Sequence, residues 1–266
     1  MDGPKLIARA LSGDNVKDKR GRAWQYHSRS DHHSRLACVA ILLDLLHASP
    51  LLVRQANEGR IGFGLNHEMR DFRSRRKKDL DFVICRPAGP LAENSPSLAD
   101  LAARIGIEAN SSARALRLAP VGSVLIALEA KACMTAHIKA LPRLFDELNS
   151  SQQTVHGATH EAIAAGFVMI NAAPEFVSPP EGLRNVHKQP HALERTLEKV
   201  RELPRRSRAD EDGYDALGIV VVSCRNDGSV VELVERPPAP QPSDIDHYDR
   251  MIDRLATLYA ARFKEI

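Results

Sequence analysis

The chain has 266 residues, of which 43% are hydrophobic and 27% charged, and its formal net charge is +3. This length can bury a sizeable core, and the composition is ordinary for a soluble globular protein. No run of eighteen apolar residues predicts a membrane span, and the first five residues lack the apolar core of a signal peptide.

Two features of the composition bear on compartment and partners. The cysteines are scattered without the close pairs of a zinc site, which fits reduced, buried thiols and a cytoplasmic location: Cys38, Cys85, Cys133 and Cys224. Two tracts are basic: Lys17, Lys19, Arg20 and Arg22, and the denser Arg70, Arg73, Arg75, Arg76, Lys77 and Lys78. Such patches suit a polyanion, although either one alone fits a solvated loop equally well.

The N-terminal 29 residues are polar and charged, which predicts a basic arm or an irregular lead-in. Ser30 or Asp31 can cap a helix over 32–47, and this helix is apolar on nearly all sides, which predicts that it is buried. Pro50 starts a short helix that runs through Asn57, and Gly59 ends it.

The middle of the chain alternates between predicted strands and helices. Strands are expected at 60–67, 80–86 and 121–130, with a loop at 87–96 and a helix at 98–105. Thr135 can cap a helix to about Leu148 that Pro142 interrupts, and a second helix is expected at 153–165. A buried strand follows at 167–171, a proline-rich loop at 173–182 and a helix at 191–203.

In the C-terminal part the sequence predicts a charged loop (204–213), a strand (217–224), a turn (226–228), a returning strand (229–234) and a last helix (245–263). These parts fit one α/β domain with a central mixed sheet flanked by helices. The expected division is a basic arm (1–29), an α/β domain (30–235, core 60–172), a proline-rich linker (236–243) and a C-terminal helix (244–266). That helix can pack on its own sheet or form the interface of a homodimer.

Two of the expected strands, which we expect to be neighbours in the sheet, carry charged groups that a core would not tolerate unpaired. By strand alternation Asp79 and Asp81 share one face, and Glu129 and Lys131 share a face of the other strand. Five apolar or small residues lead directly into Glu129. Because burying an isolated charge is costly, a divalent metal held by the carboxylates, with the lysine beside it, would resolve that cost.

This arrangement resembles the active site of the PD-(D/E)XK nuclease superfamily, which has the restriction-endonuclease-like fold. A strand with Asp, a strand with Glu-x-Lys, a helix and a strand follow one another from about Ile61 to Asn171, as in the core of that family. The chain departs from the family pattern in two ways. No proline precedes Asp81, and the 47 residues between Asp81 and Glu129 require an insertion, for which 87–121 is the candidate.

The resemblance implies a magnesium-dependent phosphodiesterase in which manganese can substitute. Asp81, Glu129 and the backbone carbonyl of Ala130 would bind Mg²⁺, which prefers hard oxygen ligands, and Lys131 would orient the attacking water. Asp79 is either a further ligand or the partner of a neighbouring arginine. Asp81 is the preferred ligand because it directly precedes an apolar run. Whether one or two metals bind stays open.

Other polar residues are weaker candidates. His137 begins the helix after the Glu-x-Lys strand and is a candidate contact to phosphate or metal, although a lone histidine is more often a polar surface group. Asp44 could supply a further acid, but a surface or salt-bridged Asp44 is the expected outcome. His156 and His160 have the spacing of a zinc pair without the glutamate of the metalloprotease signature.

The leading hypothesis is a DNA endonuclease, with a restriction or defence role that only the resemblance implies. Its expected contacts to duplex DNA are Arg70, Arg73, Arg75, Arg76, Lys77, Lys78 and His137. The low aromatic content of 5% favours duplex over single strands. The alternative is a non-catalytic nucleic-acid-binding or assembly subunit that retains the fold. DNA versus RNA and the need for a partner protein stay open, whereas an enzyme on small phosphorylated molecules lacks a glycine-rich phosphate loop.

Overall fold

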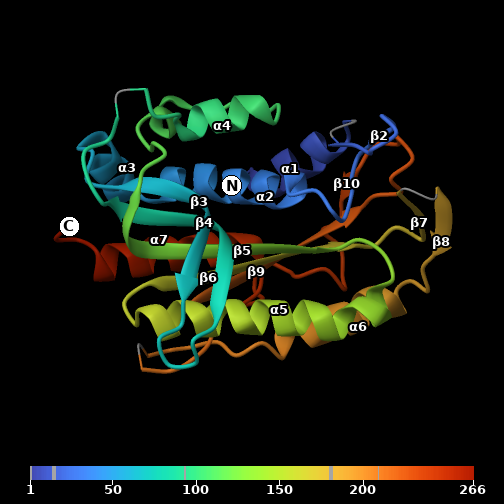
Figure 1. The fold of residues 1–266 in the computed structure, drawn as a ribbon. Coiled ribbons are helices and arrows are strands. Elements are labelled where there is room, and N and C mark those ends of the chain that lie inside the picture. Colours follow the sequence, from blue (N-terminus) through green and yellow to red (C-terminus); the bar gives the residue numbers. More distant parts are fainter. Residues whose placement is uncertain (1, 14–15, 93, 180–181, 209) are drawn as a thin grey trace.

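The computed structural model describes residues 2–13, 16–92, 94–179, 182–208 and 210–266 (Figure 1). Its helices are α1 (Gly3–Leu11), α2 (His32–Ala48), α3 (Pro50–Asn57), α4 (Leu98–Arg104), α5 (His137–Ala158), α6 (His191–Arg201) and α7 (Tyr248–Arg262). Its strands are β1 (Val16–Lys17), β2 (Ala23–Trp24), β3 (Gly62–Arg70), β4 (Lys77–Pro87), β5 (Val121–Cys133), β6 (Ile163–Asn171), β7 (Glu175–Ser178), β8 (Leu183–Val186), β9 (Ala216–Ser223) and β10 (Glu232–Leu233).

A mixed sheet lies at the centre of the fold. Within the described residues it has six strands in the order β10–β9–β6–β5–β4–β3. The pairs β3–β4, β4–β5 and β9–β10 are antiparallel, whereas β5–β6 and β6–β9 are parallel. Parallel neighbours need a long crossover, which α5 and α6 supply. The expected α/β class with a central mixed sheet is therefore confirmed.

Helices cover both faces of this sheet (Figure 1). On one face α2 and α7 pack against the strands, with α1 against α2, and on the other face lie α5 and α6. Each face has its own apolar core, and we call them the α2-side core and the α5-side core. Burial on both faces explains why every residue of β6 is buried.

Most of the elements predicted from the sequence are confirmed. α2, α3, α4, α6 and α7 lie where apolar periodicity and capping residues place them. Ser49 caps α3 by accepting a hydrogen bond from the Leu52 amide (3.3 Å), and Ser97 and Asp100 form a capping box at α4. The strands β3, β4, β5, β6 and β9 are confirmed as well, and β10 forms the returning partner of β9.

The irregular lead-in expected over residues 1–29 is wrong for the first part of that segment. Residues 3–11 form α1, with Ile7 and Leu11 buried against the rest of the fold. Asp44, buried in the middle of α2, accepts hydrogen bonds from the backbone amides of Asp2 (3.2 Å) and Gly3 (2.8 Å). These are the orphan donors of a helix start, so a side chain 41 residues away in sequence completes α1. Asp44 thus caps α1 and is buried, and among the described residues it forms no salt bridge.

Three expectations in the second half of the chain are also wrong. A single helix, α5, runs through Pro142 and replaces the two helices expected up to about Leu148 and over 153–165. Its N-cap position is Ala136, and Thr135 instead lies 3.2 Å from the His187 ring. The expected loop at 173–182 contains β7, which pairs with β8 as a hairpin.

α7 packs on β9, β6 and α2, so its apolar face is buried within the chain: Tyr248, Met251, Ile252, Leu255 and Tyr259. That is the first of the two placements expected for the C-terminal helix. No single helix of the described segments has the length and apolar composition of a membrane span, and α2 with α3 meets that test only as a pair bent by 100°.

Candidate active site

The Asp-bearing and Glu-x-Lys strands are neighbours, as β4 and β5, and the candidate site lies where they separate. Their ladder begins at the Phe82–Leu128 pair. One residue beyond it, the Asp81 carboxylate accepts a hydrogen bond from the backbone amide of Ala130 at 2.9 Å. This bond fixes Asp81 beside the residue between Glu129 and Lys131, so the structure brings the three side chains to one place.

The regular alternation of β4 breaks at Asp81. Leu80 belongs to the α5-side core and Phe82 to the α2-side core, although both have even positions on the strand. Across the β3–β4 pair the facing residue Asn66 has φ 47°, a left-handed conformation that breaks an extended strand. Asp79 is consequently exposed opposite Glu68 and does not share the surroundings of Asp81, contrary to the expectation of one common face.

Glu129 is the most constrained group of the site, because only 2% of its surface is exposed. Its Oε1 lies 2.6 Å from Lys131 Nζ and 3.6 Å from Lys78 Nζ. These contacts are ion pairs without hydrogen-bond alignment, and Oε2 has no hydrogen-bond partner within the described part of the chain. Burial raises the pKa of Glu129, and so does the charge of Asp81, whereas both lysines oppose the rise.

Lys131 is held in its charged form. Burial alone would lower the pKa of Lys131, but the neighbouring carboxylates of Glu129, Asp81 and Glu147 outweigh burial and raise it. Its side chain keeps 25% exposure, and its Nζ lies 3.9 Å from Glu147 Oε2. A protonated ammonium that reaches solvent can orient a water or stabilise negative charge, but it cannot accept a proton.

A pocket of about 480 Å³ has Asp81, Ala130 and Lys131 in its wall, whereas buried Glu129 does not line it. The sequence did not single out other residues of the wall, among them Arg29, His33, Arg143 and Glu147. Burial, and next the charge of Lys131, lower the pKa of His33 to about 4, so its ring is neutral. The only sequence signal for Arg143 and Glu147 is their i,i+4 spacing, which forms a 2.6 Å ion pair on α5.

The donor set fits a divalent cation. A buried carboxylate oxygen without a hydrogen-bond partner is costly, and a bound cation would satisfy it. Among the described residues no group of three or more His, Cys, Asp or Glu side chains is placed to hold a metal. Magnesium, however, usually takes one or two carboxylates and keeps several waters. Asp81, Glu129 and the carbonyl of Ala130 would form such a set.

The basic tract at 70–78 forms the β3–β4 turn, and none of its residues lines the pocket. Several of its cations are engaged elsewhere: Arg73 with Asp71 (3.6 Å) and Asp212 (3.3 Å), Arg76 with the Gln153 side chain (2.9 Å), and Lys77 with Glu68 (2.9 Å). Lys78 reaches inward to Glu129 and donates to the carbonyl of Glu147 at 3.0 Å. Arg70 and Arg75 are exposed.

His137 lies in the interior rather than at the pocket. It is 3% exposed, and its Nε2 donates to the carbonyl of Asn171 at 2.8 Å. Burial lowers its pKa to about 4. A neutral ring bound to the backbone and absent from the pocket wall does not contact phosphate, so we withdraw His137 from the expected nucleic-acid contacts.

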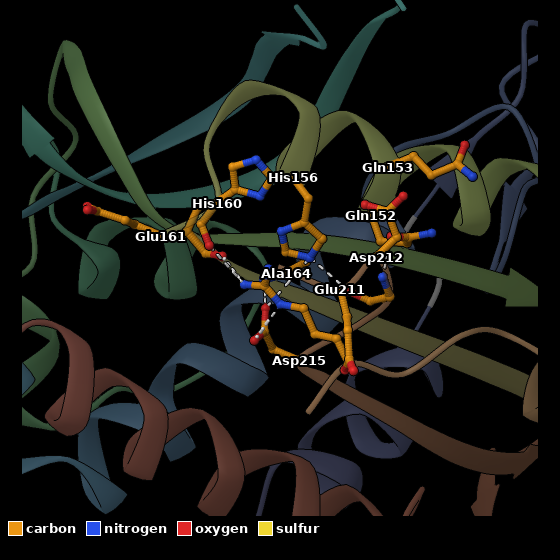
Figure 2. A network of polar contacts seen from close by, with 12 residues as sticks. Gln152, Gln153, His156, His160, Glu161, Ala164, Glu211, Asp212 and Asp215 are labelled. Atoms are coloured by element: carbon orange, nitrogen blue, oxygen red, sulfur yellow. Dashed lines mark hydrogen bonds and ion pairs between the residues drawn. The ribbon is translucent and has the colours of Figure 1, made fainter. Parts of the chain in front are cut away.

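His156 belongs to a separate buried network, shown in Figure 2. Its Nε2 donates to the carbonyl of Gly213 (2.8 Å) and lies 3.8 Å from Asp215, whose carboxylate binds Arg206 (2.9 Å) and Arg262 (2.6 Å). His160 contributes its backbone carbonyl, which accepts from Arg206 at 3.2 Å. The pair is therefore structural, as its lack of a metalloprotease signature suggested.

Comparisons of the chain with protein-family models, with curated proteins and with solved structures find no significant match.

Proposed function

We propose that this protein is a metal-dependent endonuclease that hydrolyses DNA phosphodiester bonds on a restriction-endonuclease-like core. The observation that carries the proposal is the hydrogen bond from the Ala130 amide to Asp81. It brings the Asp81 carboxylate to the backbone between Glu129 and Lys131. The order β4, β5, α5, β6 supports it, because the Asp strand, the Glu-x-Lys strand, a helix and a strand follow one another as in that family.

In this proposal each residue of the site has a separate role in hydrolysis. Asp81, Glu129 and the carbonyl of Ala130 would hold Mg²⁺, for which Mn²⁺ would substitute. A cation bound there would supply positive charge against the phosphate and would make the attacking water easier to deprotonate. Lys131, charged and partly exposed, positions the attacking water and stabilises the negative charge that develops on the phosphate. Glu147 and Glu129 hold the Lys131 ammonium between them.

Cleavage assays test this proposal. Plasmid, linear duplex and single-stranded DNA are incubated with the protein and Mg²⁺, Mn²⁺ or chelator. D81N, E129Q and K131M should each lower the rate at least about 100-fold, the scale of losing one electrostatic stabiliser. D79N is the matched control, because Asp79 is exposed two residues from Asp81, and it should cut like the parent. If D81N, E129Q and K131M all cut as well as the parent, the assignment is wrong.

One observation favours the second candidate, a non-catalytic nucleic-acid-binding or assembly subunit. Glu129 already faces two lysines, Lys131 at 2.6 Å and Lys78 at 3.6 Å, which neutralise it without a cation. Such a protein would bind DNA in chelator with a steep salt dependence but would show no turnover with either metal. The same assays, run beside a binding titration, separate the two functions.

A further inference from the structure

A basic hairpin precedes, in the chain, the residues of the pocket wall that begin at Tyr26. β1 and β2 pair antiparallel through Val16–Trp24 and Lys17–Ala23, and the turn between them carries exposed Lys19, Arg20 and Arg22. We call residues 16–24 the basic hairpin. Among the described residues, which omit 14 and 15, no carboxylate lies within ion-pair distance of Lys17, Lys19 or Arg20. These charges therefore face solvent.

The one carboxylate of the basic hairpin is turned inward. Asp18, whose side chain is 3% exposed, accepts hydrogen bonds from the backbone amides of Arg20 (2.8 Å) and Arg22 (3.0 Å). Its other oxygen accepts from Arg22 Nε (2.9 Å) and Trp24 Nε1 (3.3 Å). The Arg22 guanidinium lies 5.4 Å from the centre of the Trp24 ring. Asp18 thus fixes the turn and leaves the outward surface cationic.

The segment after the hairpin is anchored and leads into the pocket wall. The Gln25 side chain donates to the carbonyl of Ser229 (2.7 Å), and the Tyr26 amide donates to the Asn226 side chain (2.8 Å). Buried Tyr26 packs against the His33 ring at 4.8 Å. Ser28 and Arg29 then line the pocket that holds Asp81 and Lys131.

The distance along the chain from the hairpin to the pocket wall is short enough for one bound polymer to contact both. Ser28 follows Trp24 by four positions, which span at most about 14 Å, or about four nucleotides at 3.4 Å each. The β3–β4 turn differs, because several of its cations are bound to acids or amides of the chain and none lines the pocket. Of the two basic tracts, the one at 16–29 has both solvent-facing charge and continuity with Asp81.

We propose that the basic hairpin and Arg29 form the surface that holds a nucleic-acid backbone beside the pocket. The inference deepens the proposed function, since it assigns the substrate-holding surface of that same site. It also moves the expected contact from residues 70–78 to residues 16–29. Binding is carried by phosphate contacts and is therefore independent of sequence and of the metal.

The test measures binding of a short labelled DNA duplex by fluorescence anisotropy in chelator, so that no cleavage is needed. The triple variant K17A/K19A/R20A should raise Kd at least about tenfold and reduce the slope of log K against log salt by about 2.7, or 0.9 per phosphate contact. The triple variant R70A/R73A/R76A removes equal charge from the β3–β4 turn and should change Kd less than about threefold. Thermal unfolding checks that both variants fold.

Trp24 supplies a second readout, because it is the only tryptophan of the chain. Duplex added to the parent should change its fluorescence. The inference is overturned if the parent does not bind duplex, if binding leaves the Trp24 signal unchanged, or if the hairpin variant binds like the parent. It is also overturned if the protein binds phosphatidylserine vesicles through the hairpin but not duplex.

The outcomes separate this inference from the proposed function. A parent that cleaves DNA, together with a hairpin variant of unchanged Kd, refutes only the surface. A parent that binds through the hairpin and never cleaves with Mg²⁺ or Mn²⁺ refutes only the nuclease.

Discussion

Glu129 shows how far one residue can be predicted from a strand pattern. An apolar run that ends in Glu-x-Lys places a carboxylate at the end of a buried strand, and the structure has Glu129 2% exposed beside Lys131. The position of Asp81 close to Glu129 and Lys131 was also predicted, because the two strands were expected side by side. The contribution of Glu147 could not be predicted, since it depends on how α5 crosses the sheet.

The sharpest prediction for a single side chain concerns Asp215. This carboxylate is 1% exposed and forms ion pairs with Arg206 and Arg262. It also accepts a hydrogen bond from the Ala164 amide (2.8 Å), and both residues are labelled in Figure 2. D215A removes the carboxylate that neutralises buried Arg206 and should lower the free energy of unfolding by about 3–5 kcal/mol. Urea unfolding measures the loss.

Asp212 provides the control for that measurement. It lies in the same loop and also contacts an arginine, Arg73 at 3.3 Å, but its side chain is 48% exposed. D212A should cost no more than about 1 kcal/mol, as is usual for surface ion pairs. Equal losses for D215A and D212A would show that the buried network adds no stability.

Among the elements, α5 shows where local signals mislead. Pro142 and the polar stretch after Leu148 predicted a break, but the helix is continuous over His137–Ala158. Tertiary contacts hold its polar half: Gln152 accepts a hydrogen bond from the Gly213 amide at 2.7 Å, and the Tyr214 hydroxyl donates to the Leu148 carbonyl at 2.7 Å. A sequence window cannot contain a partner sixty residues away. For the same reason, a sequence window could not predict that Asp44 caps α1.

Pro142 lies inside α5, is exposed and lacks the amide that would bond to the Ile138 carbonyl. P142A should therefore raise the free energy of unfolding by about 1–2 kcal/mol, the helix gain less the added freedom of the unfolded chain. P50A is the control, because Pro50 is the first residue of α3, where proline costs no helix bond. A gain from P50A as large as that from P142A would contradict this account.

At the scale of the whole molecule, the alternation of apolar runs and helical segments predicted the α/β class and the mixed sheet. It could not predict that β4 leaves β5 at Asp81, since this depends on the left-handed Asn66 and on cores at both faces. It also missed the hairpin of β7 and β8, because prolines near 174 and 179 disguise it. The candidate site lies at the first of these irregularities.

Buried histidines make the stability of the whole fold depend on pH. Burial lowers the pKa of His137 and His156 to about 4, so the unfolded chain binds protons that the folded chain excludes between about pH 6.5 and pH 4. Stability therefore falls as the pH falls through that window. Glu129, whose pKa is raised by burial, acts in the opposite sense. The contribution of one histidine is accordingly measured as a difference between variants.

The free energy of unfolding of the parent should fall between pH 7 and pH 5. In H137Q this fall should be smaller by about 1–2 kcal/mol. Urea unfolding at the two pH values measures it. The same substitution at His191, which is exposed at the start of α6, should leave the pH dependence of the parent unchanged. A pH dependence that H137Q does not alter would mean that the pKa of His137 is the same in the folded and the unfolded chain, which contradicts this account.

Titration of the protein with Mn²⁺, followed by calorimetry, tests most directly whether Asp81 and Glu129 hold a divalent cation beside Lys131. The parent should bind Mn²⁺, and D81N and E129Q should each weaken binding at least about tenfold, since each removes one of two charged ligands. D79N should bind within twofold of the parent. Binding that D81N and E129Q leave unchanged, or that D79N alone abolishes, would contradict the site.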